Sequence, residues 1–338
     1  MKYLRLVFLP FSFIYFIIIS LRNTLYRMNI LKSHKIPAFV ISVGNIITGG
    51  SGKTPLCIIL TELFLSLDKK VCIISRGYRR SSKGLIVGFD GVYSEVIENT
   101  GDELMMIIDR FSSFTGRFFV LADSNRVRAA YYAVSKFNPD IIILDDAFQH
   151  LSIKRDMNLL IRDCDSNEFN DKLLLPAGNM REPAYSIRRA DIIIKNYKFS
   201  EITKDSTNDS NTINANYISK GLYNKNNLPI QDTNRKYAVV FSGLAKNESF
   251  FKYVIKIPGL LVKEAIGYPD HHEYSTCDID YLISHYEENS IYITTEKDFV
   301  KLRKYTDFLN NFEVYYLKIE LITDKNRIIN TFNSISNI

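Results

Sequence analysis

Residues 38–54 read AFVISVGNIITGGSGKT and join a short apolar run to a glycine-rich loop that ends in Lys53 and Thr54. A strand, such a loop, Lys-Thr and a helical pattern in direct succession are the context of a P-loop. Glycines let backbone N–H groups turn toward phosphate oxygens, and the helix start adds the positive end of its dipole. The first glycine of the usual GxxxxGK[ST] pattern is replaced by Ile47. The stretch predicts a phosphate-binding loop, and a ligand-free strand-to-helix turn is the alternative.

The loop carries the residue types that a nucleotide with its metal ion needs. Lys53 is expected to reach the β- and γ-phosphates and to act in catalysis, and the Thr54 hydroxyl is expected to ligate Mg²⁺. The expected nucleotide-contacting residues are Ile47, Thr48, Gly49, Gly50, Ser51, Gly52, Lys53 and Thr54.

Two carboxylates follow a later apolar run. Residues 141–144 read IIIL, and Asp145 and Asp146 come directly after them. P-loop enzymes hold Mg²⁺ with an acid at the end of a neighbouring strand. Asp145 is therefore the expected metal organiser, with Asp146 beside it, and an exposed acid pair at a strand end is the alternative.

The apolar runs along the chain are continuous rather than alternating, as in parallel strands that are covered on both faces. They are AFVISV (38–43), VCIIS (71–75), FFVLA (118–122), DIIILD (140–145), MNLLIR (157–162) and DIIIK (191–195). Helical spacing at 53–68, 101–111 and 124–137 separates several of them. This alternation predicts an α/β fold, a P-loop NTPase-like, doubly wound and mostly parallel sheet.

Changes of composition mark the expected domains. Residues 36–199 form the predicted P-loop core, and 200–235, rich in Asn, Asp, Ser, Thr and Lys, are expected to be a polar linker or excursion. Residues 236–338 contain apolar runs of their own and predict a smaller C-terminal α/β lobe.

Residues 1–35 contain an uncharged segment, LVFLPFSFIYFIIISL at 6–21, with a basic stretch behind it. The segment is slightly shorter than the ~20 apolar residues of a straight membrane span. Its basic flank is typical of the cytosolic side of a membrane. We expect a membrane-anchoring or partly inserted helix; a signal sequence and a buried helix are the alternatives.

Composition narrows the classes of function. The chain has 338 residues, 46% hydrophobic and 24% charged, with a net charge of +6, which excludes a wholly disordered or disulfide-stapled protein. This modest charge favours phosphate-bearing small molecules or anionic lipid over nucleic acid. The four cysteines form no CxxC pair, as suits a reducing, cytoplasmic setting. A regulatory GTPase would carry Asn-Lys-x-Asp, and neither Lys195-Asn196 nor TEKD at 295–298 has that order.

Several strings occur together in one order. They are GNIITGGSGKTP (44–55), SRGYRR (75–80), GDE (101–103), DDAFQH (145–150), RD (155–156), LLPAGNMRE (174–182), DHH (270–272) and TEKD (295–298). With the apolar N-terminus, the chain resembles the tetraacyldisaccharide 4′-kinase family, the lipid A 4′-kinases of Gram-negative bacteria, over residues 1 to about 305. DDAFQH followed by LLPAGNMRE is the specific part. The family's GDE is often followed by Pro, where this chain has Leu104.

The resemblance implies transfer of the γ-phosphate of ATP, with Mg²⁺, to the 4′-hydroxyl of tetraacyldisaccharide 1-phosphate, giving lipid IVA. It implies a membrane-embedded substrate, a place on the cytoplasmic face of the inner membrane, and neither nucleic acid nor a stable protein partner. A membrane-associated P-loop ATPase or nucleotide switch without a lipid acceptor is the alternative function; it would not need the GDE and DHH motifs.

The resemblance also assigns roles to single residues. It makes Asp102 the general base with His271 as its partner, although Asp102 can instead cap the helix that starts there. It gives Glu103 a metal or water contact beside Thr54, Asp145 and Asp146. The residues that it implies for binding the disaccharide and its 1-phosphate are Arg76, Arg126, Gln149 and His150.

Overall fold

The computed structural model describes residues 3–77, 80, 82–94, 97–164, 169–200, 210–230 and 236–336. The chain divides into two compact units. The first contains Met1–Tyr217 and Leu321–Ile338, and the second contains Ile218–Glu320. The second unit is therefore inserted into the sequence of the first, and strands β8 (Thr212–Tyr223) and β12 (Val314–Thr323) carry the chain between them.

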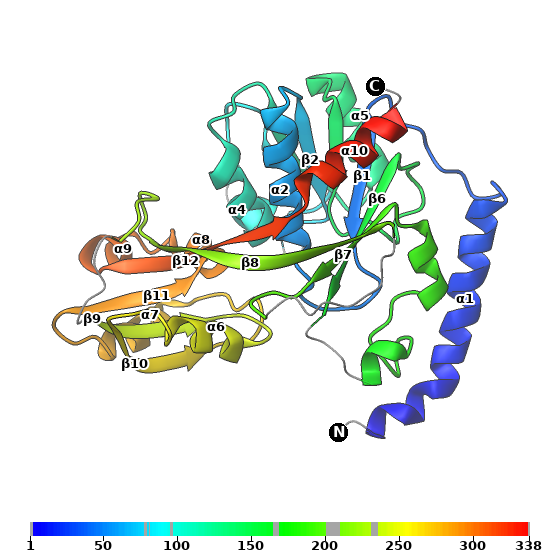
Figure 1. The fold of residues 1–338 in the computed structure, drawn as a ribbon. Coiled ribbons are helices and arrows are strands. Elements are labelled where there is room, and N and C mark those ends of the chain that lie inside the picture. Colours follow the sequence, from blue (N-terminus) through cyan, green and yellow to red (C-terminus); the bar gives the residue numbers. More distant parts are fainter. Residues whose placement is uncertain are drawn as a thin grey trace. The chain divides into compact units, whose positions relative to one another are not determined.

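The first unit is built around a sheet with the strand order β8-β7-β6-β1-β5-β2-β4-β3 (Figure 1). Its strands besides β8 are β1 Phe39–Gly44, β2 Val71–Ser75, β3 Ile86–Phe89, β4 Phe118–Ala122, β5 Ile141–Leu144, β6 Met157–Asp163 and β7 Ile192–Asn196. Its helices are η1 Tyr3–Phe8, α1 Leu9–Arg27, α2 Lys53–Ser66, α3 Ile97–Thr100, α4 Asp102–Phe111, α5 Arg126–Phe137, η2 Phe169–Lys172, η3 Ala184–Arg189 and α10 Lys325–Ser336. Neighbouring strands from β8 to β4 pair in parallel, and β3 is antiparallel to β4.

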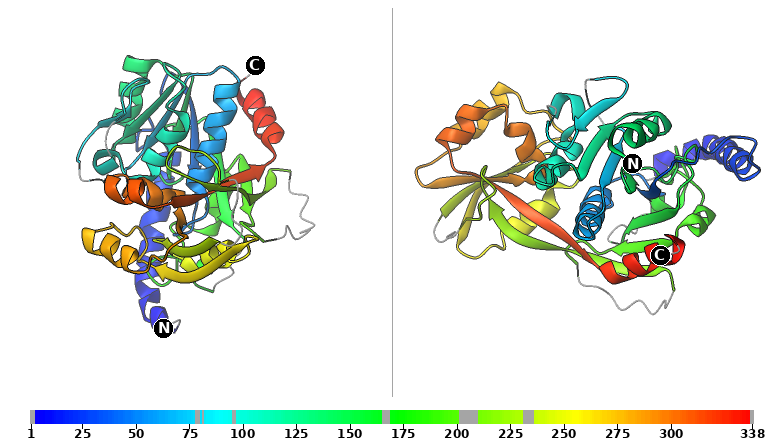
Figure 2. Two further views of the ribbon diagram at one scale, coloured as in Figure 1. Left: turned by 90° about the vertical axis from the view of Figure 1, so that its left-hand side faces the viewer. Right: turned by 90° about the horizontal axis from the view of Figure 1, so that it is seen from above.

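Helices cover both faces of this sheet (Figures 1 and 2). Alternate residues of a strand point to opposite faces. Ile41 and Ile143 pack under α2, α4 and α10, whereas Val40 and Ile142 pack against α5. Both faces are therefore dry, which explains why the strands read as continuous apolar runs.

The P-loop strand lies in the middle of the sheet. β1 pairs with β5 from Phe39↔Ile141 to Ser42↔Leu144, and with β6 on its other edge. Because parallel neighbours end at the same edge of a sheet, the loop after β1 and the acids after β5 emerge side by side. The sheet order thus brings Lys53 and Asp145 to one place although 92 positions separate their numbers.

Helix α1 lies against the first unit through polar contacts. Ser12 and Ile19 are its buried side chains, and much of the remaining surface is exposed and apolar. In the described part of the chain, the helical segment Arg5–Arg27 is the one long and apolar enough to cross a membrane, a test that core helices and signal sequences also pass. Figure 1 shows α1 running along the outside of this unit.

The second unit is a smaller α/β unit. Its strand order is β10-β9-β11-β12-β8, and the printed pairs among β9 to β12 are parallel. Its further elements are β9 Lys236–Ser242, α6 Asn247–Val254, β10 Leu260–Gly267, α7 Thr276–Ser284, β11 Ser290–Thr295, α8 Glu296–Leu302 and α9 Thr306–Asn311. Phe241 and Tyr292 are among the aromatic side chains at the centre of its core.

The fold confirms the predicted class, a mostly parallel α/β sheet with a smaller α/β lobe, and differs from the sequence expectation in three places. The stretch 200–235, expected as a polar linker or excursion, contains β8, whose Ile213, Ala215 and Leu222 are buried. Residues 201–209 and 231–235 of that stretch lie outside the described residues. Helix α10 lies within the expected C-terminal lobe 236–338 but belongs to the first unit. Strand β3 has no counterpart among the strands expected from the sequence.

Candidate active site

The loop between β1 and α2 is shaped by a glycine with no room for a side chain. Gly52 has φ 101°, and a Cβ added there would lie 2.5 Å from Nδ2 of Asn196 and 2.7 Å from the Tyr217 hydroxyl. Asn196 also donates from Nδ2 to the carbonyl of Ser51 at 2.9 Å. Strand β7 therefore supports the loop from behind, which fixes the backbone that leads into α2.

Ile47, which replaces the first glycine of the motif, has a structural role instead. It forms an isolated antiparallel bridge with Met180, and its side chain packs on the cluster that contains Ile46 and Phe148. The next residue, Thr48, donates from its backbone N–H to the carbonyl of Asn179 at 2.9 Å. An extended residue with a large side chain suits this position because the loop here is fastened to a second segment.

Lys53 and the acids after β5 form one charged group. Nζ of Lys53 lies 3.7 Å from Oδ1 of Asp146 and 3.5 Å from the carbonyl of Gly49. Arg181 donates to both carboxylate oxygens of Asp146, at 3.0 and 2.9 Å. Burial by itself raises the pKa of Asp146, but Lys53 and Arg181 lower it more, and the net pKa lies below the usual range.

Asp145 is buried and has a different environment. Its carboxylate accepts hydrogen bonds from the Ser75 hydroxyl at 3.1 Å and from the Cys57 thiol at 3.6 Å. Burial raises its pKa, and the negative charges of Glu103 and Asp146 raise it further. Glu103 therefore lies close enough to interact with Asp145, as the sequence analysis expects of these acids. A divalent cation would offset this concentration of negative charge.

The donors in this group are hard oxygens, which suit Mg²⁺. In the part of the chain that the structure describes, no three His, Cys, Asp or Glu side chains converge as a ready-made metal cage. Mg²⁺ usually takes one or two carboxylates together with substrate phosphates and water. Thr54, Asp145 and Asp146 thus fit the ion.

Asp102 begins helix α4 directly after Gly101. It is 8% exposed, and its Oδ1 accepts the backbone N–H of Glu103 at 2.9 Å. An N-cap side chain instead accepts the N–H of the second or third residue after it. The N-cap position of α4 is held by Gly101, where no side-chain cap hydrogen bond forms. The contact with Glu103 therefore does not support the helix-capping alternative, and the role of Asp102 as general base stays a prediction.

The four expected substrate residues have unlike environments. Arg126 is buried and donates to the backbone carbonyls of Asp123 and Asp145. Gln149 donates from Nε2 to the carbonyl of Asn45 at 2.9 Å, so it connects the ends of β1 and β5. Arg76 is exposed, and its positive charge adds to burial in lowering the pKa of Arg126. The ring of His150 contacts the Ser152 hydroxyl at 2.9 Å. Arg79, beside this set in SRGYRR, lies outside the described residues.

His271 belongs to the second unit. It adopts φ 58°, and its backbone N–H donates to the carbonyl of Gly243 at 3.1 Å. Its Nε2 lies 2.9 Å from Nζ of Lys297. Because a lysine ammonium has donors only, Nε2 accepts in this contact. Lys297 therefore fixes the orientation of the imidazole.

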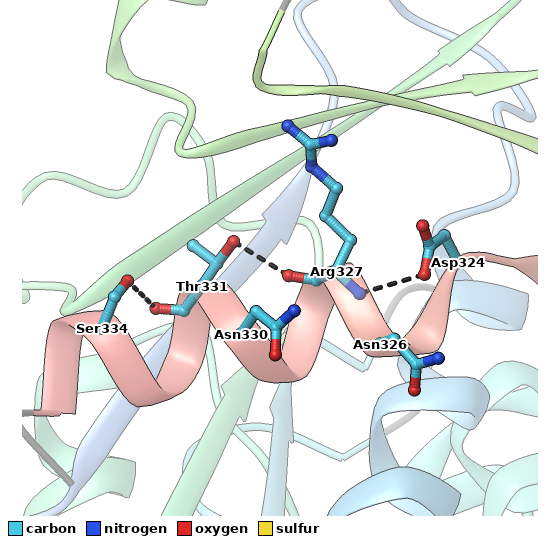
Figure 3. Close-up of a pocket in the computed structure, with 6 residues that line it drawn as sticks. All are labelled: Asp324, Asn326, Arg327, Asn330, Thr331 and Ser334. Atoms are coloured by element: carbon cyan, nitrogen blue, oxygen red, sulfur yellow. Dashed lines mark hydrogen bonds between the residues drawn. The ribbon is translucent and has the colours of Figure 1, made fainter.

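Sequence reasoning missed Arg181, Asn179 and Asn196, which fix Asp146 and the P-loop. Arg181 and Asn179 lie in LLPAGNMRE at 174–182, part of the specific resemblance to the kinase family, and this string is the signal that points to them. A polar pocket elsewhere is lined by Asp324, Asn326, Arg327, Asn330, Thr331 and Ser334 (Figure 3). All six belong to the start of α10 or to that helix, and none is an expected site residue.

Comparisons with known proteins identify the family of this chain. A model of the LpxK family, tetraacyldisaccharide-1-P 4′-kinase, matches residues 4–336. The chain belongs to this family. The tetraacyldisaccharide 4′-kinase of Aquifex aeolicus is 40% identical over 315 residues, which cover 92% of this chain and 94% of the relative. That of Halothermothrix orenii is 34% identical over 343 residues, which cover 91% and 86%. A crystal structure described as the "apo" form of Aquifex aeolicus LpxK in complex with ATP has a TM-score of 0.78 at 36% identity, covering 97% of this chain and 99% of that one.

His150 generates a prediction on pH. Burial lowers its pKa to about 4, and the nearby charges of Arg126, Arg155 and Arg22 add to this effect. The unfolded chain binds this proton near pH 6.5, so between about pH 6.5 and 4 the unfolded state holds more protons than the folded one. Stability should therefore fall as pH decreases through this window, and His150→Gln should reduce the fall. Urea unfolding from pH 7 to 4 measures it.

If the unfolding free energy of His150→Gln depends on pH as it does in wild type, this imidazole is protonated as readily in the folded protein as in the unfolded chain.

Proposed function

We propose that this chain transfers the γ-phosphoryl group of ATP to the 4′-hydroxyl of a tetraacylated disaccharide 1-phosphate. The single observation that carries the proposal is the group formed by Lys53, Asp145 and Asp146 at the ends of β1 and β5, in a chain of this kinase family. A P-loop lysine and strand-end acids suit phosphoryl transfer, in which positioning and charge stabilisation supply most of the catalysis.

Each residue of this group has a definite task in the proposed reaction. Lys53 stabilises negative charge that develops on the transferred phosphoryl group. Thr54, Asp145 and Asp146, with Glu103 beside them, would hold Mg²⁺, which would neutralise phosphate charge. Asp102 accepts the proton of the sugar hydroxyl. The hydroxyl oxygen forms a bond to the γ-phosphorus of ATP, and the bond between that phosphorus and the ADP oxygen breaks. A positioned base of this kind contributes about 10²–10⁴ in rate.

The direct test uses the purified full chain with ATP, Mg²⁺ and tetraacyldisaccharide 1-phosphate. Mass spectrometry of the lipid should show the gain of one phosphoryl group. In Lys53→Ala the rate should fall by about 10²–10³, the usual loss of one preorganised donor to developing charge. ATP hydrolysis without a change in lipid mass would favour the alternative, an ATPase without a lipid acceptor.

We propose that His271 acts together with Asp102, by orienting the carboxylate or by sharing its proton. The support is the resemblance of DHH at 270–272 to the family's motif, together with the contact of Nε2 with Lys297, which fixes the orientation of the imidazole. Asp102→Asn should lose most of kcat with stability and ATP binding intact, since the amide still accepts a hydrogen bond at the helix start but takes up no proton.

The two substitutions are best measured together. If the residues act as a unit, His271→Ala should cost far less kcat in the Asp102→Asn background than in wild type. The measurement is kcat at saturating ATP for both single variants and the double variant. Fully multiplicative losses of kcat would mean that the two residues act independently. An active Asp102→Asn enzyme would mean that Asp102 is not the base and has a structural role at the start of the helix.

The membrane location of the enzyme is also a proposal. Helix α1 and the turn before it expose large apolar side chains, namely Val7, Phe8, Leu9, Phe11, Phe13, Ile14, Ile17, Ile18 and Leu21. Behind them Arg27, Lys32 and Lys35 are exposed cations that suit anionic lipid. Because the opposite side of α1 hydrogen-bonds to the protein, α1 lies along the cytoplasmic surface of the inner membrane with its apolar side in the lipid.

Substitutions on the exposed side of α1 test this location. Phe13→Ser with Ile17→Ser should lower binding to vesicles of phosphatidylethanolamine and phosphatidylglycerol by tenfold or more, since a buried Phe or Ile contributes about 1.5–3 kcal/mol. Co-sedimentation with the vesicles measures it. Arg27→Gln should remove only a salt-sensitive part. Unchanged binding of the double variant in high salt would assign the contact to another surface.

A further inference from the structure

The segment 174–182, LLPAGNMRE, holds the P-loop from one side. The carbonyl of Asn179 accepts hydrogen bonds from the backbone N–H of Thr48 at 2.9 Å and from its hydroxyl at 3.2 Å. The backbone N–H of Arg181 donates to the carbonyl of Ile46 at 2.7 Å. With the bridge between Ile47 and Met180, these contacts fasten the first half of the loop to a second stretch of backbone.

The same segment orients the Asp146 carboxylate. The two hydrogen bonds from one guanidinium nitrogen of Arg181 reach both carboxylate oxygens. Asp146 itself has φ 45°, an unfavourable conformation for a side-chain-bearing residue. Arg181 is thus a positioning residue, because it acts on the metal site through Asp146.

Helix α1 contacts this segment from the other side. The Ser12 hydroxyl donates to the carbonyl of Leu174 and accepts the backbone N–H of Ala177, both at 3.0 Å. The Tyr15 hydroxyl donates to the carbonyl of Arg181 at 2.8 Å. Arg22 pairs with the fully buried carboxylate of Glu182 at 3.2 Å.

The contacts of Arg181 connect the two sides. Its carbonyl accepts from α1, its N–H donates to the P-loop, and its side chain holds Asp146. Only Ser12 and Ile19 of α1 are buried, so little apolar area holds the helix in place. An element with few buried apolar contacts opens at low free-energy cost. The docking of α1 is therefore the part of this connection that can change.

We propose that segment 174–182 couples the docking of α1 to the nucleotide site, so that a docked α1 and bound ATP-Mg²⁺ stabilise one another. The inference rests on the proposed function for the identity of the nucleotide. Coupling between two sites is reciprocal: whatever docked α1 contributes to nucleotide affinity, bound nucleotide contributes to docking. Because the apolar side of α1 faces lipid, binding to the membrane would support the active loop conformation.

Ser12→Ala with Tyr15→Phe tests the helix side of the connection. This variant removes the hydroxyls and keeps the apolar side of α1. Its affinity for ATP-Mg²⁺ in detergent should fall about three- to tenfold, the range that one or two hydrogen bonds contribute. Its binding to phosphatidylethanolamine and phosphatidylglycerol vesicles should match wild type. Phe13→Ser with Ile17→Ser is the matched control. Its affinity for ATP-Mg²⁺ in detergent should match wild type, and its binding to the vesicles should fall.

Arg181 tests the other side. Arg181→Lys keeps the charge but lacks the planar guanidinium, so the Mg²⁺ requirement for ATP binding should rise about 10–100-fold, as for partners of metal ligands generally. In wild type, ATP-Mg²⁺ should slow amide hydrogen exchange in α1, and in Arg181→Lys this protection should shrink. Melting temperatures of all variants show whether the fold is kept.

The outcomes separate this inference from the proposed function. Wild-type affinity for ATP-Mg²⁺ in a folded protein with Ser12→Ala and Tyr15→Phe would overturn the coupling. So would a rate of amide hydrogen exchange in wild-type α1 that does not change when ATP-Mg²⁺ binds. Both measurements use ATP-Mg²⁺ without the lipid acceptor and remain informative if the lipid gains no phosphoryl group. If the wild-type chain binds no ATP, the proposed function fails first.

Discussion

The parallel pairing of β1 with β5 is the constraint on which the rest of the site depends. It places the end of the P-loop strand beside the end of the strand that carries the acids, and it does so through backbone hydrogen bonds that are insensitive to side-chain identity. Both faces of these strands are covered by helices, so the pair has no freedom to slip in register without moving buried side chains into the wrong layer. A cation and two carboxylates can thus be held near one another at a sheet edge at little further cost.

Two neighbouring aspartates serve different purposes because their surroundings differ. Asp145 is enclosed by Ser75 and Cys57, where burial and like charge disfavour its ionised form. Asp146 points to Lys53 and Arg181, which favour the ionised form. The pair therefore offers one carboxylate whose ionised form Lys53 and Arg181 stabilise, and one for which burial and like charge outweigh the attraction of Lys53. The second is the stronger reason for a metal ion at this place.

Much of the sheet and the acids could be predicted, because doubly covered parallel strands read as apolar runs and acids after such a run lie at one edge. Strand β8 escaped because Asn, Asp, Ser, Thr and Lys dominate the stretch 200–235 that contains it, and tertiary pairing with β7 overrides that local signal. Arg181 escaped for another reason: an arginine in a loop has no periodicity, and its partner lies 35 positions earlier in the chain. His271 was named by resemblance only, since spacing says nothing of a residue that is far away in the sequence.

The return of α10 to the first unit has a consequence for synthesis of the chain. Phe332 places its ring 4.7 Å from that of Phe39 and 5.0 Å from that of Phe64, so the helix that completes this core is translated after the entire second unit. The apolar α1 leaves the ribosome long before that. For most of translation the first unit has its apolar N-terminal helix but lacks part of its core, and such a partly built core is prone to aggregate. If a bilayer captured α1 early, as the proposed membrane location implies, it would keep nascent chains apart until their last helix arrives.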